Sequence, residues 1–141
     1  MKKALCLLLL PLLFACDKDS DRRNVNPFLP EYSFSVSINR NLPQYQGLNS
    51  PLNPVPVDID GAGISGLIVM KISDTDYRAW EAACPNQYPQ ACSRMTIKNN
   101  TTSKCSCENF EYSLLTGVGG GSYTMKPYRY EIQGEVLRIY N

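Results

Sequence analysis

Histidine is absent from this sequence of 141 residues. That absence excludes Ser-His-Asp triads, Cys-His nucleophile pairs and zinc sites with imidazole ligands. Net charge is also nearly absent, because 14 Lys and Arg against 13 Asp and Glu leave a formal charge of +1. Such a balance provides no electrostatic basis for binding nucleic acid, so no nucleic-acid partner is expected. What is present is a chain with six cysteines, 43% hydrophobic residues and a length typical of one domain.

The chain begins with a short basic segment, Met1-Lys2-Lys3, and an apolar run over residues 4–14. The run is too short to span a bilayer and has the length of the hydrophobic part of a signal peptide. It ends in Leu13-Phe14-Ala15-Cys16, which resembles the bacterial lipobox. We therefore predict a lipoprotein signal peptide over residues 1–15, with Cys16 lipidated and inserted into a membrane. An ordinary signal peptide or a single anchor helix is the alternative.

Residues 16–30 are predicted to form an acidic, polar tether. Its first part, Asp17-Lys18-Asp19-Ser20-Asp21, resembles the acidic export signals of surface lipoproteins in some outer-membrane bacteria, or is a simple soluble spacer. The expected location is therefore the cell envelope, lipid-anchored at the outer membrane on its periplasmic or surface face. The expected partners are the lipid membrane, through acylated Cys16, and an unidentified envelope protein.

Residues 31–141 are predicted to form a single all-β domain. Tyr32, Phe34, Val36 and Ile38 alternate with serines, which is typical of a strand with one buried face. Further short β-type runs recur at the spacing of a sandwich or barrel, and no segment longer than ten residues has helical periodicity. Residues 39–56 are expected to be loop, and Gln133-Gly134 a tight hairpin turn. The other expected strands cover residues 55–59, 67–72, 76–82, 95–97, 110–114, 128–132 and 136–140.

Four cysteines of the expected mature chain form two clusters, Cys84 with Cys92 and Cys105 with Cys107. An even number of cysteines in an exported protein indicates disulfides, whereas a four-thiolate metal site usually has a Cys-x-x-Cys pair, which is absent. If residues 105–107 are extended, Cys105 and Cys107 are expected to pair away from each other, each with a cysteine of the other cluster. Two pairings remain open: Cys84–Cys105 with Cys92–Cys107, or Cys84–Cys107 with Cys92–Cys105.

The sequence around these cysteines resembles Rieske [2Fe–2S] domains. Tyr77-Arg78-Ala79-Trp80-Glu81-Ala82-Ala83-Cys84-Pro85-Asn86 is similar to the strand and first cluster loop, Cys-x-His, and Cys105-Ser106-Cys107-Glu108 stands at the second loop, Cys-x-x-His. Residues 108–117 follow the family's His-Gly-x-x-Phe-Asp-x-x-Thr-Gly in register, and 119–122 stand at its Gly-Pro loop without the proline. The resemblance covers residues 55–140. It implies a small Rieske-like β-sandwich or barrel with two cysteine-bearing loops at one tip.

Both imidazole ligand positions of the family are replaced, by Asn86 and Glu108. In a Rieske centre two thiolates hold one iron and two imidazoles hold the other. A carboxamide is a poor iron ligand and a carboxylate a hard, anionic one. The resemblance therefore implies a degenerate cluster site at Cys84, Asn86, Cys105 and Glu108, with no metal and no cofactor expected. The alternative is a retained [2Fe–2S] cluster, held through Cys84 and Cys105, in an electron-transfer protein.

The resemblance also implies a disulfide pairing. Two sulfurs that bind one iron lie almost in contact, so without the metal they can close into a Cys84–Cys105 bond. Some high-potential Rieske proteins carry a disulfide between the two loops, which implies Cys92–Cys107 as the second bond. The expected function is structural or binding rather than enzymatic, on a membrane-anchored domain that has lost its cluster.

Other residues near the cysteines have two interpretations each. Pro85, together with residues 87–90, could form an exposed contact surface or an ordinary turn. Cys105 and Cys107 could exchange disulfides, but Lys104 is the only basic neighbour that could lower a thiol pKa. Glu108 and Glu111 have the carboxylates of a hydrolytic pair, but the interpretation we favour is surface solvation.

Overall fold

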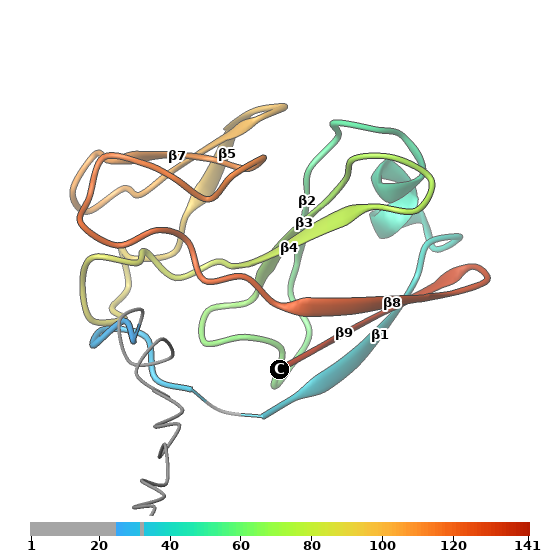
Figure 1. Cartoon of the computed structure of the whole chain (residues 1–141), viewed down its shortest axis with the longest axis horizontal. Helices are drawn as coiled ribbons and strands as arrows, with labels where there is room; N and C mark the ends of the chain where they lie inside the picture. The colour runs from blue at the N-terminus through green and yellow to red at the C-terminus, as the bar shows by residue number, and fades with distance from the viewer. Residues whose placement is uncertain (1–24, 32) are drawn as a thin grey trace, which may run out of the picture.

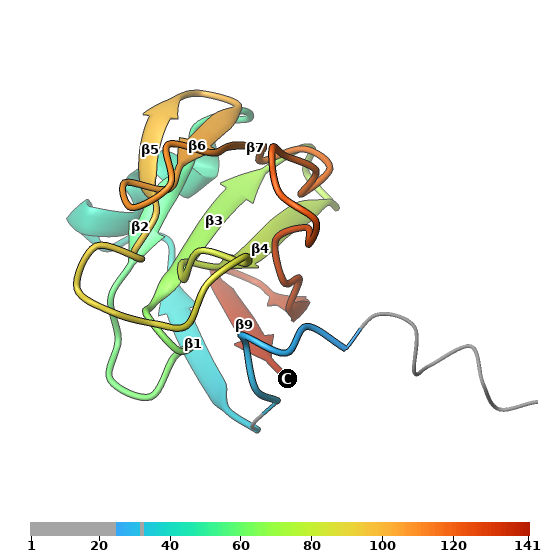
Figure 2. The same ribbon diagram turned by 90° about the vertical axis from the view of Figure 1, so that its left-hand side faces the viewer.

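The computed structural model describes residues 25–31 and 33–141, which contain nine strands and one 3₁₀ helix. The strands form three antiparallel sheets of three strands each. The sheets lie in layers, with β5–β6–β7 uppermost, β2–β3–β4 in the middle and β1–β9–β8 below (Figures 1 and 2). The predicted all-β fold class is confirmed.

The lower sheet is built from β1 (Ser35–Asn39), β8 (Arg129–Gln133) and β9 (Val136–Tyr140), with β9 in the centre. Each pairing in it joins five residue pairs without a bulge. Gln133 pairs with Val136 across the β8–β9 hairpin, so the turn residues are Gly134 and Glu135, one position later than expected. Gly134 has a φ of +58°, a conformation that glycine adopts at little cost.

The middle sheet consists of β2 (Val55–Val57), β3 (Leu67–Lys71) and β4 (Tyr77–Glu81), with β3 in the centre. Every residue of β3 is buried, which agrees with its continuous apolar sequence. Because successive side chains of a strand point to opposite faces, Leu67 and Val69 pack on one side of this sheet and Ile68 and Met70 on the other.

The upper sheet consists of β5 (Thr96–Asn99), β6 (Thr102–Lys104) and β7 (Glu111–Ser113). No strand was expected at β6, because Thr-Ser-Lys has neither apolar alternation nor strong β-propensity; pairing with β5 and β7 forms it. The 3₁₀ helix η2 (Pro43–Asn49) likewise lies in a segment expected to be loop. It begins at a proline, and Tyr45 and Leu48 anchor it against the domain.

The three layers of sheet enclose two hydrophobic cores. The base core lies between the lower and middle sheets, and the tip core lies between the middle and upper sheets. The base core contains mainly aliphatic side chains and tyrosines: Ile38, Tyr45, Leu48, Val55, Val57, Ala62, Leu67, Val69, Tyr77, Ala79, Tyr128, Leu137 and Ile139. The tip core is rich in sulfur: Ile68, Met70, Trp80, Ala82, Cys84, Met95, Cys105, Tyr112, Leu114 and Met125.

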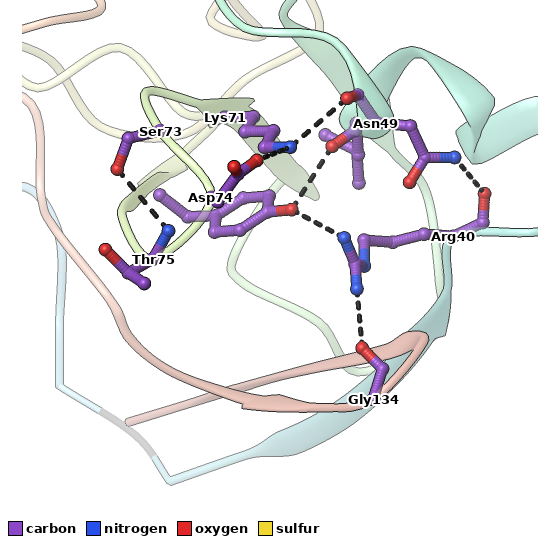
Figure 3. Close-up of polar contacts among 9 residues, drawn as sticks. Arg40, Asn49, Lys71, Ser73, Asp74, Thr75 and Gly134 are labelled. Carbon is purple, nitrogen blue, oxygen red and sulfur yellow. Dashed lines mark hydrogen bonds and ion pairs between the residues drawn. The ribbon is translucent and has the colours of Figure 1, made fainter.

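A polar network ties the turns at the base end of the domain (Figure 3). Arg40 donates to the Tyr77 hydroxyl at 2.9 Å and to the Gly134 carbonyl at 2.5 Å. The buried ammonium of Lys71 donates to the Asn49 carbonyl and pairs with Asp74 at 2.7 Å. These bonds join the ends of β1, η2, β3 and the β8–β9 hairpin, so they stabilise the scaffold.

The N-terminal expectations fall largely outside the described residues. The signal peptide over 1–15, the lipidated Cys16, the tether as far as residue 24, and Tyr32 are among them. In the described part of the chain, no helix has both the length and the apolar character that crossing a membrane requires. Residues 26–30, which the sequence placed in the tether, contact the domain: the Leu29 side chain is buried, with 2% of its surface exposed.

Candidate functional site

Two loops carry all four described cysteines. The first cysteine loop (residues 82–95) joins β4 to β5, and the second (residues 105–110) joins β6 to β7. The ends of the first loop pair through an Ala83–Arg94 bridge and a hydrogen bond from the Cys84 N–H to the Ser93 carbonyl. The second loop closes with the Cys105 N–H on the Phe110 carbonyl at 2.8 Å. Both loops are therefore held at their bases by the backbone.

The two loops are joined by two disulfides. Cys84 pairs with Cys105, with a Cα–Cα distance of 5.7 Å, and Cys92 pairs with Cys107, at 5.3 Å. This is the pairing that the Rieske resemblance implies. The expectation from the sequence assumed that residues 105–107 are extended. Instead, Ser106, Cys107 and Glu108 form a turn. The two cysteine-bearing loops thus meet at one tip of an all-β domain.

The two disulfides differ in their access to solvent. Cys84 and Cys105 are fully buried in the tip core, and the Gln87 amide lies 3.7 Å from the Cys105 sulfur. Cys92 is exposed and Cys107 is partly exposed. We call Cys84–Cys105 the inner disulfide and Cys92–Cys107 the outer disulfide.

Asn86 stands where the Rieske resemblance places the first histidine, and it uses both ends of its amide. Its nitrogen donates to the Tyr112 hydroxyl at 2.8 Å and to the Tyr123 carbonyl at 2.9 Å. Its oxygen accepts from the Tyr123 N–H at 2.8 Å. A Cβ at Gly121 would collide with this amide, so a larger residue there would displace the Asn86 side chain. Asn86 therefore fastens residues 119–123, which we call the glycine loop, onto the first cysteine loop.

Glu108 stands where the resemblance places the second histidine, and its carboxylate is not engaged in this way. Its Oε2 atom is buried and has no hydrogen-bond partner. Burial raises the pKa of the neighbouring Tyr112 phenol; the hydrogen bond from Asn86 opposes this shift, and the charge of Glu108 adds to it. The Glu108 carboxylate thus helps to raise the pKa of Tyr112, while its own Oε2 atom has no hydrogen-bond partner.

A groove runs along this part of the tip, with a volume of about 570 Å³. Asn86, Glu108 and Phe110 from the cysteine loops line one side, and Gly120–Tyr123 of the glycine loop line another. Phe28 of the N-terminal segment completes the wall. The segment is held there by a hydrogen bond from the Asn26 amide to the Pro85 carbonyl at 2.7 Å. Its ribbon lies beside the first cysteine loop (Figure 1).

The structure corrects two further expectations about the cysteine loops. Pro85, expected to be exposed, is buried, and Gln87 is partly buried. Tyr88 is exposed over 68% of its surface, as expected. Its ring packs edge-on against the ring of Phe28, with 5.1 Å between the centroids. Glu111 lies on β7 and pairs with Lys98 at 2.6 Å, a solvated surface role, whereas Glu108 lies in a turn with a buried oxygen.

Glu81 is a buried carboxylate that the sequence did not single out. It has no exposed surface and accepts hydrogen bonds from the backbone of Ile64, Ser65 and Ala83 and from the Tyr128 hydroxyl, at 2.6–2.9 Å. Four donors satisfy the charge, so this is a structural anchor below the first cysteine loop. An acidic residue directly after Ala79 and Trp80, at the end of a strand, was the available signal.

A [2Fe–2S] cluster of the Rieske kind does not fit this arrangement. It requires two thiolates and two imidazoles. The Cys84 and Cys105 sulfurs are bonded to each other, and both ends of the Asn86 amide are engaged. Among residues 25–31 and 33–141, no group of three or more acidic or cysteine side chains is placed to hold a metal ion.

Comparison with known proteins finds likeness in structure only. Neither the protein-family models nor the curated proteins gave a match. A chain from the complex of reduced oxygenase and oxidized ferredoxin in carbazole 1,9a-dioxygenase is similar at 16% identity and a TM-score of 0.47, over 78% of this chain and 94% of that one. A putative NADH-dependent nitrite reductase small subunit from Mycobacterium tuberculosis is similar at 13% identity and a TM-score of 0.46, over 79% and 97%. Each of these is a likeness of overall fold alone.

Proposed function

We propose that this chain is a lipid-anchored protein of the bacterial cell envelope whose Rieske-like domain has a binding or structural role in place of electron transfer. The inner disulfide is the observation that carries the proposal. It joins the two sulfurs that stand at the thiolate positions of a Rieske centre. A bond between them supplies the link between the two loops that a shared iron supplies in the family.

The replacements at the histidine positions support the same conclusion. Asn86 holds the glycine loop through two hydrogen bonds with the Tyr123 backbone, and a third reaches the Tyr112 hydroxyl, which gives its amide a structural task. Two disulfides join the cysteine loops and the Asn86 hydrogen bonds attach the glycine loop to them, so together these loops form a rigid surface. Rigid loops on a β scaffold commonly carry recognition, which supports binding as the role. No catalytic residue is assigned, since the sequence has no histidine and Glu111 is paired with Lys98.

The cluster question is tested on full-length protein purified in a non-ionic detergent. We expect no rhombic iron–sulfur EPR signal, no visible absorption and no stoichiometric iron or sulfide. Peptide mapping without reductant should recover the Cys84–Cys105 and Cys92–Cys107 pairs. A rhombic signal with stoichiometric iron and sulfide would overturn the proposal and favour the electron-transfer alternative. Free thiols at all four positions would overturn it as well.

Anchoring is tested separately by labelling cells with a fatty acid analogue and locating the protein by fractionation. The lipobox resemblance at residues 13–16 supports acylation of Cys16. We expect label on the wild-type chain in the outer membrane, and none on a Cys16→Ser variant. A Cys6→Ser variant, whose change lies inside the expected signal peptide, is the matched control and should stay labelled. Label that persists on Cys16→Ser contradicts the anchor.

A further inference from the structure

The groove at the tip combines one uncompensated acidic group with several aromatic rings. Its walls come from four separate segments: the N-terminal segment, the two cysteine loops and the glycine loop. Disulfides and the Asn86 hydrogen bonds hold three of these segments in place. The groove is therefore a property of the folded, oxidised domain.

Glu108 supplies negative charge to this groove. Its Oε2 atom is buried without a hydrogen-bond partner, an arrangement that carries a free-energy penalty. None of the six ion pairs among the described residues includes Glu108. The Asn86 amide beside it is already engaged at both ends. Glu108 also lines the groove, so a cation that enters it would meet a carboxylate that takes part in none of these ion pairs.

Aromatic rings line the rest of the groove. Phe28, Phe110 and Tyr123 contribute to its walls, and the rings of Phe28 and Tyr123 lie edge to face at 5.8 Å between centroids. The faces of aromatic rings attract cations, most strongly when the cation is weakly hydrated. Gly120 and Gly121, which have no side chains, also line the groove, and the backbone there lies close to the Phe110 ring and the Asn86 amide.

The donor set distinguishes between kinds of cation. A divalent metal ion requires several oxygen ligands, and one carboxylate with a neutral, engaged amide does not provide them. An alkylammonium group requires one counter-charge and apolar or aromatic contact around its methyl or methylene groups. The groove offers that combination.

We propose that this groove binds an alkylammonium group, with Glu108 as its counter-ion and Phe28, Phe110 and Tyr123 as its aromatic contacts. The proposal deepens, and rests on, the binding role proposed above. It names the chemistry of the ligand: a cationic amine on an alkyl chain, carried by a small molecule or by a lysine side chain of a partner.

The test is isothermal titration of the full-length protein in non-ionic detergent, with choline and with Nα-acetyl-lysine amide as probes. The neutral isostere 3,3-dimethylbutan-1-ol is the control ligand. We expect saturable binding of at least one cationic probe, and the tighter one identifies the source of the group. Binding of the alcohol should be at least about tenfold weaker, since it lacks the charge that Glu108 pairs with.

The variant Glu108→Gln should weaken binding of the cation about tenfold or more, as loss of a charged partner does. Glu111→Gln is the matched control: it removes the same charge three residues away, on the exposed Lys98 pair, and should change affinity less than twofold. Phe110→Leu should weaken cation binding while leaving Glu108 in place. Thermal melts establish that each variant is folded.

Equal binding of choline and the alcohol, equal losses in the two glutamate variants, or no saturable binding by folded protein would each overturn the inference. Iron, sulfide and disulfide analyses of the same sample separate this outcome from failure of the proposed function. An iron-free, disulfide-bonded protein that binds no ammonium contradicts the ligand only. A protein with an intact cluster contradicts both.

Discussion

The base and the tip of this domain share strands β3 and β4 and are nevertheless stabilised by different means. Three strand pairings of five residue pairs each lie around the base core: β1–β9, β8–β9 and β3–β4. The packing in this core is mainly aliphatic. Around the tip core, β5, β6 and β7 have only three or four residues, and the packing includes three methionines and a disulfide. Short strands contribute few hydrogen bonds and little buried surface, so the tip depends on covalent links where the base depends on regular pairing.

The functional consequence is a division of tasks. The base end closes its turns with the Arg40–Tyr77 and Lys71–Asp74 contacts, and the Arg40 Nε atom is its one buried nitrogen without a hydrogen-bond partner among the described residues (Figure 3). The tip contains the Glu108 oxygen without a partner and the aromatic groove. A site can carry such unfavourable groups only if other interactions hold it in place. In this domain the two disulfides and Asn86 do so.

The largest effect is expected at Glu81, which lies where base and tip meet. Glu81→Gln replaces an acceptor oxygen by an NH₂ group that faces hydrogen-bond donors, so the buried network loses its centre. We expect a loss of about 3–5 kcal/mol in the free energy of unfolding, measured by urea denaturation. Tyr128→Phe removes one donor only and should cost about 1–2 kcal/mol. Equal losses for the two variants would contradict this account.

The next effect comes from removing the disulfides pairwise. A Cys92→Ala/Cys107→Ala variant should lose about 3 kcal/mol, as chain entropy predicts for its 15-residue separation. Cys84→Ala/Cys105→Ala should lose more, because its sulfurs are fully buried and leave a cavity. Hydrogen exchange should speed up in β5–β7 and stay slow in β1, β8 and β9. Uniform acceleration across both regions would contradict the division between base and tip.

Mild reduction should distinguish the two disulfides in one molecule. The outer bond is exposed at Cys92, whereas both sulfurs of the inner bond are buried. Since thiol exchange requires access to a sulfur, a small thiol should open Cys92–Cys107 first and Cys84–Cys105 only on unfolding. Alkylation followed by mass spectrometry measures the order. Simultaneous opening in folded protein would contradict it.

The smallest effect is a pH dependence at Glu31. Hydrogen bonds from Lys126 and then from Asn141 hold the pKa of Glu31 below its ordinary value, against the effect of burial. A lowered folded pKa contributes stability above the ordinary pKa of the group, and that stability is lost as pH falls through the folded pKa. Because Glu31 is largely exposed, the change should be slight. NMR titration of its carboxyl carbon, with Glu31→Gln as the control for stability, measures it.

The sequence predicted the strands where hydrophobic periodicity is strong. The apolar run of β3 and the alternation around Val36 and Ile38 were sufficient, because burial of one or both faces sets the pattern. β6 was missed because its neighbours, and not its own side chains, make it a strand. Phe28 was missed because a single aromatic residue in a polar segment has no periodicity to reveal a contact with Tyr88 and Tyr123.

The candidate site was predictable in its parts and not in its connections. Spacing left two disulfide pairings open, and only the resemblance to Rieske domains favoured the observed one. The sequence showed directly that Asn86 and Glu108 stand where the resemblance places histidines, whereas the contacts of these two side chains could not be read from it. Asn86 binds Tyr112 and Tyr123, which are 26 and 37 residues away, and such partners are chosen by the path of the chain.

By itself, the amino-acid sequence determined the all-β class, the exclusion of histidine chemistry and an even set of cysteines in two clusters. These are properties of composition and of local sequence pattern. A local pattern reflects which individual residues of a segment are buried. The tertiary structure alone decided that one disulfide is buried and the other exposed, that Asn86 is satisfied and Glu108 is not, and that Phe28 closes a groove beside them. Each of these depends on segments far apart in the chain that meet only after the two cores have packed.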